Sequence, residues 1–205
     1  MSLLAAALSG HRPVNDDVPE VSLQASSTKL VAAARTGDRV AFGRLYDLYA
    51  RMVHGILLAR VPHDDVDDLV QEVFITALQR LGTLRDAGSF GAWLAAIARN
   101  RANDYHRHAV PEDQLADDPS GNERANVSEV RERPAAEILD VVRTLPDAYR
   151  ETLILRLVEG MTGPEIAART GLTHGSVRVN LHRGMQLVRE RLRGPNAVEQ
   201  EAPKP

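Results

Sequence analysis

The sequence contains no cysteine among its 205 residues. Disulfide bridges, thiolate metal sites and cysteine nucleophiles are therefore excluded. No apolar run approaches the roughly 20 residues that a helix needs to span a bilayer. The opening MSLLAAALSG has no basic residues before its apolar stretch, which argues against a secretory signal. These absences predict a cytoplasmic protein that does not insert into membranes.

The motifs of common enzyme sites are also missing. The sequence has no glycine-rich phosphate loop and no nucleophile elbow with a matching Ser, His and Asp set. Its seven histidines are scattered, and no Glu-x-x-His metal motif occurs. We therefore expect no enzymatic activity, no catalytic residues, no bound metal and no cofactor.

Lysine is almost absent, and arginine supplies nearly all of the positive charge. Only Lys29 and Lys204 are lysines among the 25 basic residues. The formal net charge of −3 conceals an uneven distribution, because acids gather at residues 64–72 and 109–133 while arginines gather at 169–193. The net charge of the whole chain therefore says little about its partner.

Apolar residues recur at steps of three and four, as on one face of a helix, over 40–57, 66–81, 90–108 and 138–158. Within 66–81 the predicted apolar stripe consists of Val66, Leu69, Val70, Val73, Phe74, Ala77, Leu78 and Leu81. Patterns typical of strands are absent. The sequence predicts an all-α fold of two helical domains joined by an acidic, flexible linker, the C-terminal domain containing a helix-turn-helix. The predicted parts are a disordered N-terminal extension (1–27), a first domain (28–108), the linker (109–133), a second domain (134–193) and a disordered tail (194–205).

A helix, a tight turn and a basic helix are predicted over residues 162–193. Thr162 followed by Glu165 is a capping box, and Gly171 suits the left-handed residue that ends a helix. Thr173 offers a side-chain oxygen to begin the next helix. Residues 169–193 carry six arginines and one acid. This pattern predicts a helix-turn-helix that places its second helix in a DNA major groove.

An acidic cluster stands at the start of the helix predicted over 66–81. Aspartates at this end of a helix interact favourably with its dipole, so the cluster suits a solvated or partner-facing helix start. Pairing within the chain and metal binding are the alternatives, although the alternation and central glycine of a calcium loop are missing. The cluster consists of Asp64, Asp65, Asp67, Asp68 and Glu72.

The helix predicted over 90–108 has a buried side marked by Trp93, Leu94 and Ile97. Its other positions carry arginines, asparagines, histidines and a tyrosine. Basic residues interleaved with amides and an aromatic ring suit single-stranded or melted DNA, where phosphates need neutralising and bases can stack. The alternative is a basic surface helix in which Trp93 is an ordinary core residue.

Together these segments resemble the extracytoplasmic-function group of bacterial sigma factors. The resemblance covers about 29–108 and 134–193. It rests on DDLVQEVFITAL (67–78), SFGAWLAAIARNRANDY (89–105) and the stretch from LPDAYRETL to NLHRG (145–184). It implies an RNA polymerase sigma factor that directs promoter recognition and DNA melting. The implied partners are core RNA polymerase, through the β′ clamp helices and the β flap, promoter DNA, both duplex and melted, and an anti-sigma factor.

The resemblance also implies roles for individual residues. Those matching the polymerase-binding surface are Asp68, Leu69, Gln71, Glu72 and Phe74. Those matching the segment that captures the melted minus-10 element are Arg85, Arg99, Asn100, Arg101, Asn103 and Tyr105, with Asn100 at the position where an amide meets a flipped base. Those matching the helix that reads the minus-35 duplex are Thr173, His174, Ser176, Arg178, Asn180, His182 and Arg183.

This chain departs from the family pattern at Val179 and Asn180, where a small hydroxyl residue and an arginine are common. Asparagine pairs with adenine where arginine pairs with guanine, so we expect an altered minus-35 preference. Whether Asn180 contacts a base or a phosphate is left open.

A stand-alone helix-turn-helix regulator with an N-terminal sensing or dimerising domain is the alternative function. It explains residues 162–193 but not the paired motifs at 68–74 and 89–100. Residues 1–27 match no part of the family core. The sequence does not identify their role, the promoter, the regulon, the anti-sigma factor or the inducing signal.

Overall fold

The computed structural model describes residues 20–109 and 133–193, where every regular element is a helix. The first range holds α2 (Glu20–Arg35), α3 (Arg39–Leu58), α4 (Val66–Arg80) and α5 (Phe90–Ala109), with short 3₁₀ helices η1 (His63–Asp65), η2 (Leu81–Thr83) and η3 (Ala87–Ser89). The second range holds α6 (Arg133–Arg143), α7 (Asp147–Leu157), α8 (Gly163–Thr170) and α9 (His174–Arg193). The predicted all-α class is confirmed.

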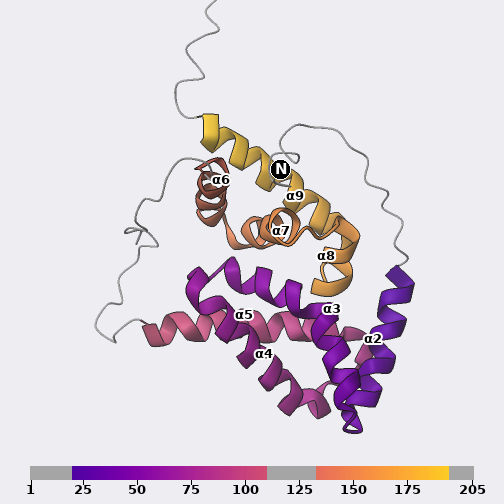
Figure 1. Ribbon diagram of the computed structural model, residues 1–205. Coiled ribbons are helices and arrows are strands. Elements are labelled where there is room, and N and C mark those ends of the chain that lie inside the picture. The colour runs from indigo at the N-terminus through magenta and orange to yellow at the C-terminus, as the bar shows by residue number, and fades with distance from the viewer. Residues whose placement is uncertain (1–19, 110–132, 194–205) are drawn as a thin grey trace, which may run out of the picture.

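Helices α2 to α5 form the first unit, with α3 packed against the other three (Figure 1). Asp38 begins α3, and its carboxylate accepts a hydrogen bond from the Ala41 N–H at 3.0 Å. Such a cap satisfies a backbone N–H that has no partner inside the helix. The apolar faces of the helices meet in a core whose largest fully buried side chains include Leu45, Met52, Ile56, Phe90 and Leu94.

The first helix differs from the sequence prediction, which placed residues 1–27 in a disordered extension. Helix α2 begins at Glu20, so that prediction was wrong for residues 20–27. Ser27 is buried and hydrogen-bonds Tyr49 of α3, and burial raises the pKa of the Tyr49 hydroxyl. The apolar pattern of α2 is weak, so its sequence alone does not indicate a helix. Packing against α3 stabilises the helix instead.

Helices α6 to α9 form the second unit, in which α9 packs against α6, α7 and α8. Leu153 and Ile154 of α7 and Val188 of α9 are buried between the helices. These contacts fix α9 on the rest of the unit, so that one side of the helix remains exposed along much of its length.

The two units pack against each other, a contact that the sequence patterns do not predict. Helix α7 lies on α3, and α8 lies against α2 and α5 (Figure 1). At Gly55 of α3 an added Cβ would meet Leu155 Cδ2 at 2.7 Å and Glu159 Cγ at 2.9 Å. The glycine therefore lets the α3 backbone approach the second unit closely. We call this packing of the two units the closed arrangement.

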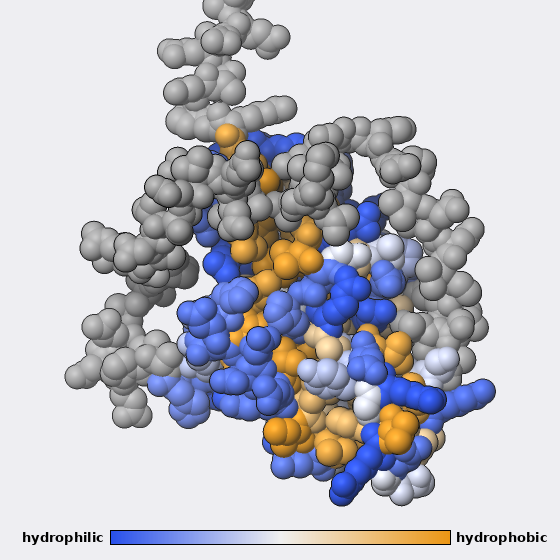
Figure 2. Space-filling model, in the orientation of Figure 1, coloured by the Kyte–Doolittle hydropathy of each residue, from blue (hydrophilic) through white to orange (hydrophobic). Residues whose placement is uncertain are grey.

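The predicted acidic linker, apart from its end residues 109 and 133, lies outside the described residues, as do residues 1–19 and the predicted tail. In the ranges that are described, no helix is long and apolar enough to cross a membrane. Figure 2 shows apolar residues running down the middle of the visible face, from the second unit onto the first, and again at the lower end, with polar side chains around them. Exposed large apolar side chains of the first unit are Val40, Tyr46, Ile75 and Leu78.

Candidate nucleic-acid interface

The helix-turn-helix is formed by α8 and α9. Thr162 and Glu165 make the predicted capping box: the Glu165 N–H donates to Thr162 Oγ1 at 3.3 Å, and the Thr162 N–H donates to Glu165 Oε2 at 2.8 Å. Burial acts to raise the pKa of Glu165, but hydrogen bonds from Thr162 and the charge of Arg169 lower it overall. Gly171 ends α8 at a φ of 76°, in the left-handed region that favours glycine. The predicted start and end of the first helix are confirmed.

Helix α9 follows the turn, as predicted. The Ser176 N–H donates to Thr173 Oγ1 at 3.1 Å, which caps the helix start. Val177 is buried and holds the N-terminal half of α9 against α8. The predicted DNA-contacting residues exposed here are Thr173, His174, Ser176, Arg178, His182 and Arg183.

Asn180 occupies a different place from the other predicted contacts of α9. It is half-buried, and its Nδ2 donates to Thr152 Oγ1 of α7 at 3.4 Å. Thr152 is itself 1% exposed. The structure thus directs Asn180 toward α7, at the edge of the exposed face, and gives its amide a partner within the protein.

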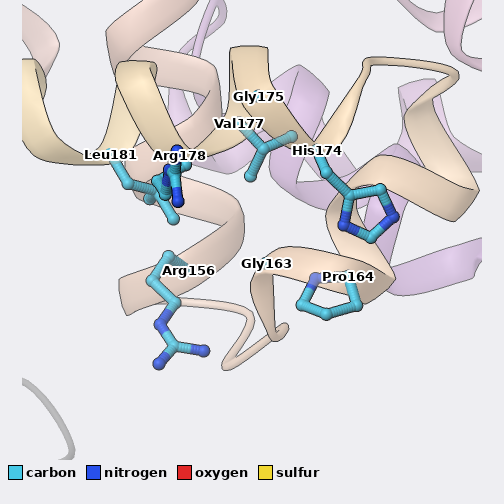
Figure 3. A pocket seen from close by; sticks show the side chains of 8 residues that line it. All are labelled: Arg156, Gly163, Pro164, His174, Gly175, Val177, Arg178 and Leu181. Carbon is cyan, nitrogen blue, oxygen red and sulfur yellow. The ribbon is translucent and has the colours of Figure 1, made fainter. Parts of the chain in front are cut away.

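A cleft lies where α9 begins beside the end of α7 and the start of α8 (Figure 3). Arg156 of α7 and Arg178 of α9 stand on one side of it, with Pro164 and His174 on the other. Arg156 also donates from Nη1 to the Met161 carbonyl at 3.1 Å, which positions its side chain. Two guanidinium groups beside one cleft suit an anion such as a DNA phosphate. The lining residues are Arg156, Gly163, Pro164, His174, Gly175, Val177, Arg178 and Leu181.

Arg156 was not among the residues predicted from sequence. It comes from α7, 22 residues before Arg178 by their numbering, and its own helix gives no sign of a nucleic-acid contact. Only the crossing of α7 and α9 brings the two arginines to one cleft. No spacing rule in a single sequence marks such a pair.

Helix α5 presents a mixed surface. Leu94 is fully buried, as predicted, whereas Trp93 and Ile97 are only partly buried and pack against the core. Asn100 and Asn103 are exposed on α5, and Arg85 is exposed in the loop before it. These three side chains are accessible for a nucleic-acid contact.

The other three residues predicted to contact melted DNA are bonded to acids. Arg99 binds Glu151 of α7, with Nη2 at 2.7 Å and Nε at 3.1 Å from its carboxylate oxygens. Arg101 forms an ion pair with Glu72 of α4. The Tyr105 hydroxyl donates to Asp65 at 2.7 Å, and this bond raises the pKa of Tyr105.

Helix α4 carries all five predicted partner-facing residues, but two of them face the core. Leu69 and Phe74 are each 4% exposed, so they form part of the core and are not available to a partner. Asp68, Gln71 and Glu72 are exposed. The helical repeat adds Ile75 and Leu78, exposed at 56% and 51%, to the same side of α4.

The acidic cluster divides between two of the alternatives left open above. Asp65 and Glu72 are paired within the chain, to Tyr105 and Arg101. Asp67 and Asp68 are exposed in the first turn of α4. The cluster therefore combines pairing within the chain with an exposed helix start.

A buried carboxylate joins the two units. Glu151 of α7 has a 6% exposed side chain, forms an ion pair with Arg60 of α3 at 2.8 Å and accepts hydrogen bonds from Arg99 of α5. Nearby, His54 Nδ1 of α3 lies 2.6 Å from Glu159 Oε1, just after α7. In the closed arrangement Arg99 is therefore engaged with the second unit.

The His54–Glu159 contact predicts a pH dependence of the closed arrangement. The hydrogen bond to Glu159 raises the pKa of His54, against the opposing effect of partial burial. The stabilisation is then fully present below the ordinary histidine pKa of about 6.5 and is lost as the pH rises through the raised value. We expect the closed fraction, measured by energy transfer between labels on the two units, to fall over that interval. His54→Gln should flatten the profile there, and an unchanged profile would contradict the assignment.

Two family models match the chain. Sigma-70 region 2 matches residues 45–110, and Sigma-70, region 4 matches residues 135–188. The region 2 match lies almost entirely on the first unit, and the region 4 match lies on the second unit.

Individual relatives agree with the family models. The chain is 32% identical over 169 residues to the ECF RNA polymerase sigma factor BldN of Streptomyces coelicolor, an alignment that covers 77% of this chain and 62% of BldN. The chain thus spans less than two thirds of that relative. It is 31% identical over 161 residues to the RNA polymerase sigma factor CarQ of Myxococcus xanthus, covering 77% of this chain and 92% of CarQ.

A solved structure is similar as well. CnrH, determined in complex with the cytosolic domain of CnrY, is 26% identical with a TM-score of 0.56, and the match covers 83% of this chain and 99% of CnrH.

Proposed function

The chain belongs to the sigma-70 family, in its extracytoplasmic-function group, and we propose that it is the detachable subunit that gives core RNA polymerase promoter choice and DNA melting. It acts without catalysing a reaction of its own, in the cytoplasm with RNA polymerase. The first unit contributes the polymerase contact and the capture of melted DNA, and the second reads duplex DNA upstream. The observation that carries this proposal is the coexistence of an exposed acidic side on α4, exposed asparagines on α5 and a capped helix-turn-helix.

The exposed side of α4 is proposed to bind the β′ clamp helices. Asp68 and Gln71 supply charge and polarity, and Ile75 and Leu78 supply apolar area next to them. Interfaces commonly combine an apolar centre with a charged rim that steers the encounter. Leu69 and Phe74 support this surface from the core. The proposed second polymerase contact, with the β flap, is assigned to the second unit from the family resemblance.

The exposed side of α5 is proposed to hold the melted minus-10 element. Asn100 and Asn103 present amides that can pair with base edges, and Arg85 can neutralise a phosphate. Arg99 can join them only after leaving Glu151, and Arg101 only after leaving Glu72. The proposed role of Tyr105 likewise requires release from Asp65.

The exposed side of α9 is proposed to read the minus-35 duplex. Ser176, Arg178, His182 and Arg183 reach outward from the N-terminal half of the helix, which is the part of a recognition helix that contacts base edges. Thr173 and His174 stand at its start, where backbone phosphates are commonly held. Asn180 is removed from this set because it faces α7.

An inhibitory protein partner is part of the proposal. CnrH was determined in complex with the cytosolic domain of CnrY. By analogy we propose that this chain binds a protein partner, and that this partner is an anti-sigma factor. A pull-down from lysate of the source cells, with and without core polymerase added as competitor, tests this.

The test of the proposed function is promoter-specific transcription. The purified full chain is added to core RNA polymerase with a library of genomic fragments, and transcript starts are mapped. We expect initiation at a small set of sites that share upstream sequences, and none without the chain. Tight duplex binding by the chain alone, with no promoter-specific initiation, would favour the stand-alone regulator instead.

Asn100→Ala tests the capture of melted DNA. Asn100 is exposed on α5, so the substitution should leave the fold intact and remove one amide from the proposed site. We expect open-complex formation, measured by permanganate reactivity of unpaired thymines, to fall by about tenfold, as for the loss of ~1–2 kcal/mol of base contact. Binding to the closed duplex should change less than twofold. Equal losses in both assays would contradict the base-capturing role.

A further inference from the structure

Val179 is an apolar side chain on the exposed side of α9. It is 45% exposed, although it lies only two residues after Val177, which is 1% exposed. Two residues advance an α-helix by about 200°, which places Val179 almost opposite the seam that Val177 and Val188 bury. Val179 therefore points away from the second unit.

One neighbour of Val179 on that side, His182, is among the residues expected to meet DNA. Gly175 lies four positions before it, His182 three positions after it and Gln186 seven positions after it, and all three are exposed. Residues at these spacings form one line along a helix. Val179 is the apolar member of this line and lies in the N-terminal half of the recognition helix, where base-edge contacts are made.

A single exposed valine is ordinary on a protein surface and by itself indicates nothing. Valine, however, has a lower helix propensity than alanine or leucine, and this side chain remains 45% exposed, outside the buried core. The side chain has no polar atom, so any contact it makes with DNA must be apolar. Among the groups that base pairs present in the major groove, the methyl group belongs to thymine.

We infer that Val179 reads a thymine in the upstream promoter element through van der Waals contact with its 5-methyl group. This inference rests on the proposed function. Of the two positions where the chain departs from its family pattern, Val179 faces outward and Asn180 faces α7. The specificity of this chain at these positions is therefore carried by Val179.

Replacing thymine by deoxyuridine tests the contact, because it removes only the methyl group and keeps every base pair. The full chain, bound to core polymerase, is titrated against promoter duplexes in which each upstream thymine is replaced singly. We expect one or two replacements to weaken wild-type binding about fourfold, which corresponds to ~0.8 kcal/mol for one buried methyl-sized group. With Val179→Ala the same replacements should change binding less than 1.5-fold.

Two further variants separate this contact from general effects. Val179→Thr keeps the branched shape and one methyl group, so its response should fall between those of wild type and Val179→Ala. Gln186→Ala, on the same line of α9, should retain the full wild-type response. The inference is overturned if no replacement weakens wild-type binding, if Val179→Ala responds as strongly as wild type, or if the upstream element contains no thymine. Absence of any promoter-specific binding by wild type would instead overturn the proposed function, and the inference with it.

Discussion

Glu151→Ala is expected to open the closed arrangement. Glu151 is buried, and the partners that it pairs with, Arg60 and Arg99, both belong to the other unit. Removing the carboxylate leaves Arg99 without its counter-charge and leaves Arg60 with only the exposed Asp147, 3.9 Å away. Breaking a buried ion pair in this way typically costs about 3–5 kcal/mol. The ratio of closed to open chains should therefore fall by more than about a hundredfold.

The absence of cysteine makes this measurable by energy transfer. Gly43→Cys on α3 and Gln186→Cys on α9 place one label on each unit, at exposed positions, and no native thiol competes for the dyes. At Gly43 an added Cβ meets nothing within 4 Å. We expect high transfer in the wild-type background and a clear loss with Glu151→Ala.

Glu137→Ala is the matched control for this experiment. Glu137 is an exposed carboxylate on α6 of the same unit, so its loss changes the net charge equally but should leave the transfer unchanged. Unaltered transfer in Glu151→Ala, with the chain still folded by circular dichroism, would contradict the role assigned to the Glu151 contacts.

Opening should also change function, because Arg99 is paired with Glu151 in the closed arrangement. If only the open form binds single-stranded minus-10 DNA, the apparent affinity is reduced by the fraction of chains that are open. Glu151→Ala should then strengthen binding to that strand. The gain is limited by the increase in the open fraction that the labels report.

Local features of this fold follow from the sequence because their causes are local. The capping box at Thr162 and Glu165 and the left-handed Gly171 depend on residues a few positions apart, and the structure contains both. The helix-turn-helix could therefore be predicted with its first helix correctly bounded. Its basic second helix was likewise found from charge and spacing alone.

Leu69 and Phe74 show how two arguments from one sequence can disagree. Their spacing placed them on the apolar stripe of α4, and burial at 4% confirms that interpretation. The family resemblance instead placed them on the partner-facing surface. For these two residues the apolar periodicity predicted burial correctly, because it reports which side of a helix faces the core. A sequence motif names residues but does not tell which way their side chains point. The same periodicity was wrong for Leu78, which it placed on the stripe although the residue is 51% exposed near the end of α4.

Contacts between the units could not be predicted from local patterns. Glu151 lies 52 positions after Arg99, and Glu159 lies 105 positions after His54. Pairing over such distances depends on how whole helices pack, and no periodicity within one segment encodes it. For the same reason the sequence did not reveal that Asn180 meets Thr152 or that α2 begins at Glu20.

Arg178→Ala and Arg156→Ala are expected to weaken promoter binding in different ways. Both side chains line the cleft at the start of α9, but Arg178 extends from the recognition helix, whereas Arg156 belongs to α7 and donates to the Met161 carbonyl. We expect Arg178 to contact a base edge and Arg156 to contact a phosphate.

The two roles differ in sequence dependence and in salt dependence. Loss of a base contact at Arg178 should cost about 1–3 kcal/mol, or roughly 5- to 150-fold in affinity, and should relax the preference at one base pair. Loss of a phosphate contact at Arg156 should weaken binding almost equally on all sequences and lower the slope of log affinity against log salt by about 1. Titrations on the promoter and on single base-pair variants, at several salt concentrations, measure both.

The pair of variants provides its own control, because each removes one guanidinium group from the same cleft and changes the net charge equally. If the cleft acts only through its charge, the two variants should be indistinguishable. Both should then show the same salt dependence of affinity, and neither should lose the preference for a particular base pair. An unchanged preference at every base pair in Arg178→Ala would contradict the base contact. A weaker preference for one base pair in Arg156→Ala would contradict the phosphate contact proposed for Arg156, because a side chain that contacts only a phosphate carries no sequence information.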